Sequence, residues 1–124
     1  MTDPKNIEQR NIEALKALIF FILILFVIAG SLDLGYLNAK KYNMIKGLEI
    51  AAWAGVQGLP DVNAARHLTL NVANSQGLAL KPSEIKIDPK GQWIQIDKRD
   101  YYETVFLYHV GINRIAFHAH VFGF

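Results

Sequence analysis

The order of apolar and polar residues divides the chain into an uninterrupted apolar run, a stretch with helical spacing, and a C-terminal part that alternates. The run is Ala17–Leu32, and it contains no charged residue. A helix that crosses a bilayer needs about 20 apolar residues, with a range of about 17–25, so this run is slightly short. Its flanks compensate, because Lys16 can extend outward, and the apolar surface continues past Asp33 through Leu34, Tyr36 and Leu37.

Two other interpretations of the run compete with a membrane anchor. A buried core helix must be covered on every face, and the rest of this sequence is too short to wrap it. A cleaved secretory signal ends in small residues, which Ala29-Gly30-Ser31 would supply. Helical sequence continues beyond Ser31, however, so we favour a retained anchor that contacts either lipid or copies of itself.

The stretch after the run has the spacing of an amphipathic helix, with apolar residues recurring up to Val56. A second stripe is made of small residues four apart, Gly47, Ala51 and Gly55. Small residues with this spacing allow another helix to approach closely, although a glycine inside a helix costs about 0.5–1 kcal/mol relative to alanine. We expect one continuous helix that ends before Pro60; the alternative is that the glycines break it.

The residues after Pro60 predict a helix followed by a β-hairpin. Asp61 is a good N-cap for a helix that runs from Val62 to about Asn74. The period then changes to two, in segments 84–88 and 92–97, which flank a turn at Pro89-Lys90-Gly91. Alternating segments joined by such a turn are typical of a hairpin with one covered face.

The last part of the chain adds one further element and a closing strand. We interpret Tyr101–Val110 as a short helix, with a strand as the alternative, and Arg114–Phe122 as a strand. The expected fold is therefore α+β and type IV pilin-like: a long N-terminal helix, apolar and then amphipathic, with a small head of helices and an antiparallel sheet. We place the long helix in residues 1–59 and the head domain in residues 60–124.

Composition narrows the function classes. The chain has 124 residues, with 13 basic and 11 acidic residues spread along it, and no cysteine. The absence of a basic block argues against nucleic-acid binding, and the absence of cysteine excludes disulfides and thiolate metal sites. Basic residues flank the apolar run on both sides, but Lys16 adjoins it whereas Lys40 is more distant. The positive-inside rule then favours an N-terminus in the cytoplasm and a head outside it.

Catalytic chemistry has few candidates in this sequence. His118 and His120 would share one face of the last strand, with His109 earlier in the chain. Two imidazoles two residues apart can share a metal ion, but half-exposed histidines on an amphipathic strand are the simpler interpretation. The sequence contains no nucleophile motif, P-loop or dinucleotide fingerprint. We therefore expect neither an enzyme nor a bound metal or cofactor.

Two acidic residues flank the apolar run, and an ionised group in apolar surroundings usually finds a partner. On a single anchor, each of them would sit at the membrane interface, solvated and without need of a partner. In a bundle of such helices, we expect Asp33 to pair with Lys40 or Lys41 of a neighbouring copy. Glu13 would pair with Arg10 or Lys16 of a neighbour in the same way.

Short motifs after the apolar run carry a resemblance to a known family. They are Asp33-Leu34-Gly35, the block Glu49–Gly55 (EIAAWAG), Phe106, and Gly111-Ile112 before the terminal strand. Together with the order of elements, they resemble TadE/TadG-like proteins of tight-adherence (Flp) pilus systems. The resemblance implies a membrane-anchored, pilin-like or accessory protein with a structural role outside the cytoplasm.

The favoured hypothesis is a structural subunit of an extracellular filament or tube, assembled from copies of the chain through the apolar helix. Before assembly, one helix would hold it in the cytoplasmic membrane, in contact with lipid. The alternative is a membrane-anchored accessory module of a pilus or secretion assembly. The residues expected at the assembly interface are Glu13, Phe20, Phe21, Leu25, Asp33, Gly47, Ala51 and Gly55.

Overall fold

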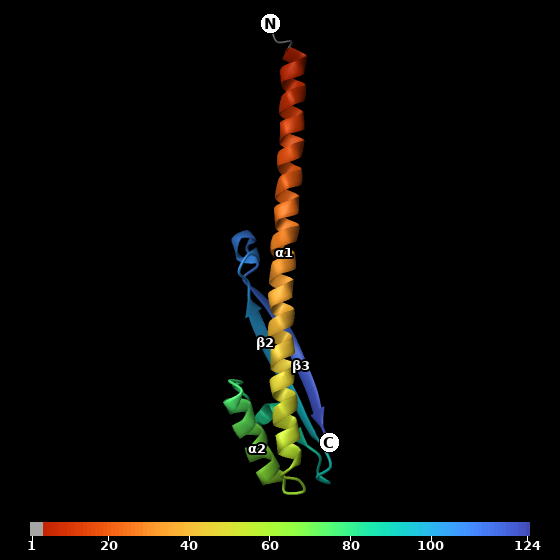
Figure 1. Ribbon diagram of the computed structural model, residues 1–124, viewed down its shortest axis with the longest axis vertical. Coiled ribbons are helices and arrows are strands. Elements are labelled where there is room, and N and C mark those ends of the chain that lie inside the picture. Colours follow the sequence, from red (N-terminus) through yellow and green to blue (C-terminus); the bar gives the residue numbers. More distant parts are fainter. Residues whose placement is uncertain (1–3) are drawn as a thin grey trace.

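The computed structural model describes residues 4–124 and contains one very long helix with a small head packed along part of it (Figure 1). The regular elements, in chain order, are α1 (Pro4–Val56), α2 (Val62–Ser75), the 3-10 turn η1 (Pro82–Glu84), β1 (Ile85–Ile87), β2 (Ile94–Glu103), the 3-10 turn η2 (Leu107–Val110) and β3 (Arg114–Gly123). This layout confirms the predicted α+β, pilin-like fold class.

Helix α1 is continuous for 53 residues, through the apolar run and through the glycines that follow it. The prediction of an unbroken helix is thus confirmed. The helix ends at Val56, and the turn that follows contains a cis peptide bond between Leu59 and Pro60. Asp61 then caps α2 as expected, because its side chain accepts hydrogen bonds from the backbone N–H groups of Asn63 and Ala64.

The three strands form one antiparallel sheet in the order β1-β2-β3. The register sets Ile85 opposite Ile96 and Ile96 opposite Val121, which aligns buried apolar side chains across all three strands. The predicted hairpin and closing strand are both confirmed. On β3, Ala119 and Val121 are buried, while the alternate residues face the other side of the sheet, as period-two alternation requires.

The interpretation of Tyr101–Val110 as a helix is wrong. Strand β2 continues to Glu103, with Tyr101 opposite Ala116 and Tyr102 opposite Ile115. Aromatic residues fit a pleated surface well, and here β3 pairs with this segment along its whole length to Glu103. The helical part is the single turn η2, which ends at Gly111 in the left-handed conformation, with φ of 88°.

The hydrophobic core lies between the C-terminal half of α1, helix α2 and one face of the sheet. Its largest fully buried apolar side chains are Leu48, from α1, and Ile94 and Ile96, from β2. Small residues of α1 and α2, including Gly55 and Ala65, let the two helices approach each other. The C-terminal half of α1 is therefore part of the folded head, whereas the N-terminal half extends away from it (Figure 1).

Candidate functional site

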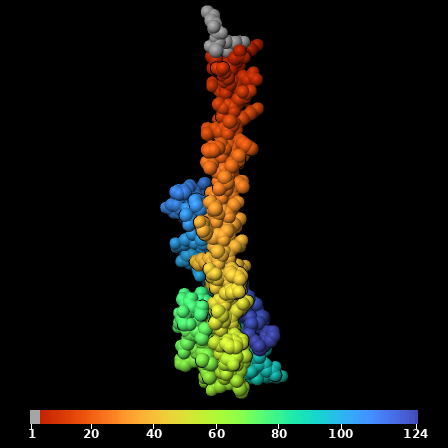
Figure 2. Space-filling model, viewed as in Figure 1, coloured from red at the N-terminus to blue at the C-terminus, as the bar shows by residue number. Residues whose placement is uncertain are grey.

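The N-terminal half of α1 is the largest unpartnered apolar surface among the described residues. Every residue from 4 to 28 is exposed, and the exposed fraction reaches 66% at Phe20 and 64% at Val27. In Figure 2 this half forms a narrow column that projects beyond the head. The helix is long and apolar enough to cross a membrane and could serve as its anchor.

Four of the eight residues predicted at an assembly interface lie on this projecting half. Glu13 is exposed among polar neighbours that include Arg10 of the same helix. Phe20, Phe21 and Leu25 are exposed within the apolar part. These four side chains are free to contact lipid or another copy.

The stripe of small residues is occupied within the chain, which corrects the expectation that it receives a neighbouring copy. A Cβ atom added at Gly55 would come within 2.0 Å of Thr69 Oγ1 in α2, and one at Gly47 within 2.8 Å of Leu78 Cδ1. Ala51, between them, is fully buried. The close approach that the stripe allows is therefore made by α2 and the segment after it, because these are tethered to α1 by a short turn.

Asp33 is also satisfied within the chain, so its expected pairing with Lys40 or Lys41 of another copy is wrong. Its side chain is fully buried, and its carboxylate accepts hydrogen bonds from the end of β2 and from the β2–β3 connection. The donors are the Tyr102 hydroxyl at 3.0 Å, the backbone N–H of Val105 at 2.9 Å, that of Phe106 at 3.1 Å and that of Leu107 at 2.6 Å. Lys40 instead donates to the backbone carbonyl of Tyr101, at 2.8 Å.

The role of Asp33 follows from where β2 ends. Beyond Glu103 the chain leaves the β2–β3 ladder, so the next N–H groups need another acceptor. A carboxylate that accepts several backbone N–H groups forms strong, charge-assisted hydrogen bonds. Burial, together with the hydrogen bond to Asp33, raises the pKa of Tyr102, which keeps its hydroxyl protonated as a donor. Asp33 thus fixes the β2–β3 connection against α1.

A second polar cluster lies on the outer face of the sheet, where the register sets Asp97 opposite His120. Asp97 contacts His120 Nδ1 and lies 3.3 Å from His118 Nε2, and Gln95 donates to it at 2.7 Å. The hydrogen bond with His120 lowers the pKa of Asp97, against the opposing effect of partial burial. Sequence reasoning paired the two histidines with each other and found no ligand spacing that includes Asp97; the strand register brings Asp97 to them.

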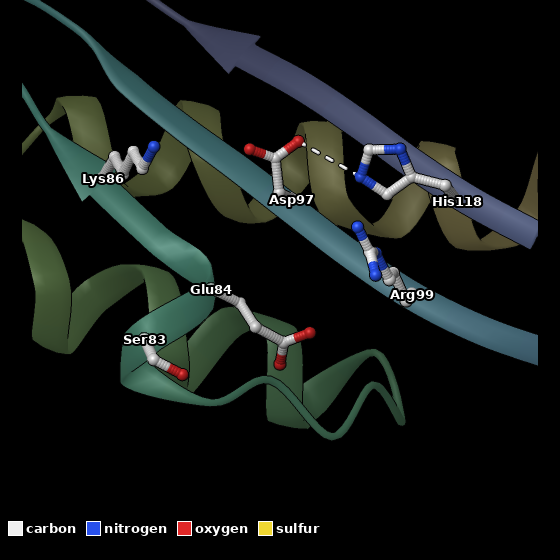
Figure 3. Close-up of a pocket in the computed structure, with 6 residues that line it drawn as sticks. All are labelled: Ser83, Glu84, Lys86, Asp97, Arg99 and His118. Carbon is white, nitrogen blue, oxygen red and sulfur yellow. Dashed lines mark ion pairs between the residues drawn. The ribbon is translucent and has the colours of Figure 1, made fainter.

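The cleft beside this cluster has a volume of about 400 Å³ and is lined by Ser83, Glu84, Lys86, Asp97, Arg99 and His118. Figure 3 shows Asp97 and His118 directed toward each other across neighbouring strands. Charges of both signs line it, and His118 is half exposed. Within residues 4–124, no group of three or more histidine or acidic side chains is arranged to hold a metal ion.

Of these sites, the projecting apolar half of α1 is the one whose surface requires a partner. The outer-face cluster is internally paired, whereas the side chains of residues 4–28 are exposed on all sides of the helix. Comparison with protein-family models, curated proteins and solved structures finds no match to this chain.

Proposed function

We propose that this protein is a structural subunit of an extracellular filament or tube, assembled through the N-terminal half of α1. The observation that carries the proposal is the exposure of the apolar run through residue 28, with Phe20 at 66% and Phe21 at 58%. Burying one such side chain contributes about 1.5–3 kcal/mol. A surface of this size needs lipid or other helices around it.

The pilin-like layout supports assembly from copies of the chain. The head covers only the C-terminal part of α1, so the narrow apolar half can pack with its copies at the centre while heads surround them (Figure 2). The sequence resemblance to TadE/TadG-like proteins of tight-adherence pili agrees with such a role. Before assembly, the apolar half would hold the subunit in the cytoplasmic membrane with the head outside.

A second candidate function is a membrane-anchored accessory module of a pilus or secretion assembly. One observation favours it: Asp33 and the small-residue stripe, which would otherwise suit contacts between subunits, are satisfied inside one chain. The exposed surface of the N-terminal half of α1 consists mainly of large apolar side chains, and contact with lipid alone is sufficient for such side chains.

Shearing of intact cells distinguishes the two functions. A filament subunit is released into the medium as polymers that electron microscopy resolves and an antibody to the head decorates, whereas an accessory module remains in the membrane fraction. The double variant Phe20→Ala and Phe21→Ala should reduce the sheared polymer while the protein still enters the membrane. Phe124→Ala, which removes a phenylalanine that is 89% exposed on the head, serves as the matched control. Dispersed membrane monomers in the unmodified strain would contradict the filament proposal.

A further inference from the structure

The connection between β2 and β3, residues 104–113, has an unusual surface for a loop. Its sequence, TVFLYHVGIN, contains no aspartate, glutamate, lysine or arginine. Val105, Tyr108 and Val110 are 57%, 60% and 55% exposed. Loops of soluble domains are generally polar, and a group of exposed apolar side chains indicates a surface that contacts something apolar.

This loop lies beside the apolar run of α1, away from the rest of the head (Figure 1). Successive contacts trace its path along the helix toward the N-terminus. Lys40 bonds to Tyr101, Asp33 to Tyr102, and the site of Gly30 lies next to Leu107. Beyond these, loop and helix together line an apolar groove of about 520 Å³, whose helix side includes Ile22, Leu25 and Phe26.

Several backbone N–H groups of the loop have hydrogen-bond partners within the protein. Asp33 accepts from the N–H groups of residues 105–107, as described above. Within the loop, His109 N–H donates to Phe106 O, Gly111 N–H to Tyr108 O and Ile112 N–H to Leu107 O, at 3.1–3.3 Å. Lipid-exposed irregular backbone is normally excluded from the hydrocarbon region, because its unsatisfied N–H and C=O groups are costly there, and the hydrogen bonds above remove part of that cost. The buried Asp33 carboxylate therefore accepts the hydrogen bonds that water would accept from an ordinary surface loop.

Burial of Asp33 also lengthens the apolar surface of α1. Asp33 is the first charged residue after Lys16, and because it is buried, it does not interrupt the helix surface. The apolar surface therefore continues from Ala17 to Leu37. These are about 21 residues, which span about 31 Å at 1.5 Å per residue. That length matches the hydrocarbon thickness of a bilayer, about 30 Å, and explains how a run that is slightly short can cross it.

We infer that the β2–β3 loop enters the membrane leaflet on the side of the head and is a second membrane contact of this protein. It inserts Val105, Phe106, Tyr108 and Val110 among the acyl chains, beside the helix to which Asp33 clamps it. The charges at the base of the loop, Glu103 and Arg114, are 72% and 62% exposed at the side chain and meet the head groups. Exposed Tyr36 and Tyr101 lie near this boundary, where amphipathic rings are favoured.

A lipid surface fits this region better than a partner protein. The uncharged loop and the uncharged run form one continuous apolar zone, and the first exposed charges on both segments come after it. Such a boundary is expected where a bilayer ends. The inference rests on the membrane anchor in the proposed function, and it adds that the head is seated in the bilayer rather than held away from it.

The absence of cysteine allows a direct test with single-cysteine variants of the full chain. Val110→Cys probes the loop, Leu25→Cys probes the anchor, and Lys90→Cys, in the exposed β1–β2 turn, is the matched control on the head. Each variant is labelled with an environment-sensitive nitrobenzoxadiazole fluorophore. Each is then reconstituted at about one copy per phosphatidylcholine vesicle. Quenching by aqueous iodide is compared with quenching by doxyl groups on the lipid acyl chains.

The expected result is that Val110→Cys behaves like Leu25→Cys. Both should be shielded from iodide several-fold relative to Lys90→Cys and be quenched by the doxyl lipids. Iodide quenching of Val110→Cys equal to that of Lys90→Cys, with Leu25→Cys still shielded, would overturn the loop inference and leave the anchor intact. Shielding of Val110→Cys without doxyl quenching would mean that another copy covers the loop, which also overturns it. Exposure of Leu25→Cys to iodide would refute the anchor itself.

Discussion

The two halves of α1 show how the same helix can be apolar for two different reasons. In the N-terminal half, large side chains such as Phe20 and Val27 are exposed on every side. In the C-terminal half, the buried positions include Gly47, Ala51 and Gly55, which are small because α2 and the sheet lie against them. The buried half therefore has its partner within the chain, and the exposed half must find one outside it.

The sharpest test of this comparison removes a leucine from each half. Leu48→Ala creates a cavity at a fully buried position of α1, and such a change costs about 2–5 kcal/mol. Leu25→Ala, at a position that is 49% exposed, should change the stability of the head by less than about 0.5 kcal/mol. Thermal and denaturant unfolding of the head in detergent micelles measures both. Equal losses in the two variants would show that the N-terminal half has a partner in the folded monomer.

A second test fills the space where α1 and α2 meet. Gly55→Leu forces a Cβ atom against Thr69 Oγ1, Ile94 Cδ1 and the Ala65 carbonyl, at 2.0–3.1 Å. Overpacking of this kind costs about 1–3 kcal/mol, and more where backbone must move. Unfolding of the isolated monomer in micelles should detect this loss. Gly35→Ala is the control, because nothing lies within 4 Å of its added Cβ. A Gly55→Leu head as stable as the unmodified one would mean that the stripe is free for another copy.

The third test concerns Asp33, whose hydrogen bonds hold the β2–β3 connection against α1. Asp33→Ala leaves the buried N–H of Leu107 and the partly buried N–H groups of Val105 and Phe106 without this acceptor, and an unsatisfied buried donor costs about 1–3 kcal/mol. Hydrogen exchange should rise at these amides and less in β1, at the far end of the sheet. Glu49→Ala removes an exposed carboxylate from the same helix as a control. Adding Lys40→Met to Asp33→Ala should restore nothing, since Lys40 bonds to Tyr101; a recovery of stability would support a pairing of Asp33 with a lysine.

Periodicity was sufficient to predict the elements whose partners are close in sequence. The hairpin around Lys90, the helix capped by Asp61 and the faces of the last strand all follow from local patterns. The stripe of small residues correctly predicted that another segment packs closely against α1. It did not identify that segment, since a pattern on one helix does not identify its partner. Tyr101–Val110 was misassigned because aromatic residues suit both strand and helix, and only pairing with β3 decides between them.

The apolar part of the candidate site, the exposed run of α1, was predictable from the sequence, whereas the role of Asp33 was not. The exposed run is visible in the sequence because it is long and uncharged. The role of Asp33 depends on N–H groups that are more than 70 residues away, and no local spacing reports such a contact. The signal that was available is the uncharged, apolar sequence of the loop at residues 104–113.

The smallest expected effect on stability is at the polar cluster on the outer face of the sheet, which belongs to neither half of α1. The pKa of Asp97 is lowered in the folded head by its hydrogen bond with His120, so the ionised carboxylate stabilises the fold. This contribution is fully present above the unfolded pKa, about 3.9 for aspartate, and is lost as pH falls through the lower folded value. The side chain of Asp97 is 34% exposed, and solvent screening keeps the gain small.

Substitution of Asp97 separates this effect from general acid unfolding. Asp97→Asn should flatten the fall in stability of the head below about pH 4, where the carboxylate would be titrating. Above that range it should cost a small amount, because an amide can still accept from Gln95 but does not replace the carboxylate in its contacts with His118 and His120. Glu103→Gln, whose ion pair with Arg114 is 4.0 Å long and well exposed, is the control and should leave the profile unchanged. A profile for Asp97→Asn that overlays that of the unmodified chain would show that the outer-face cluster is solvated rather than coupled to folding.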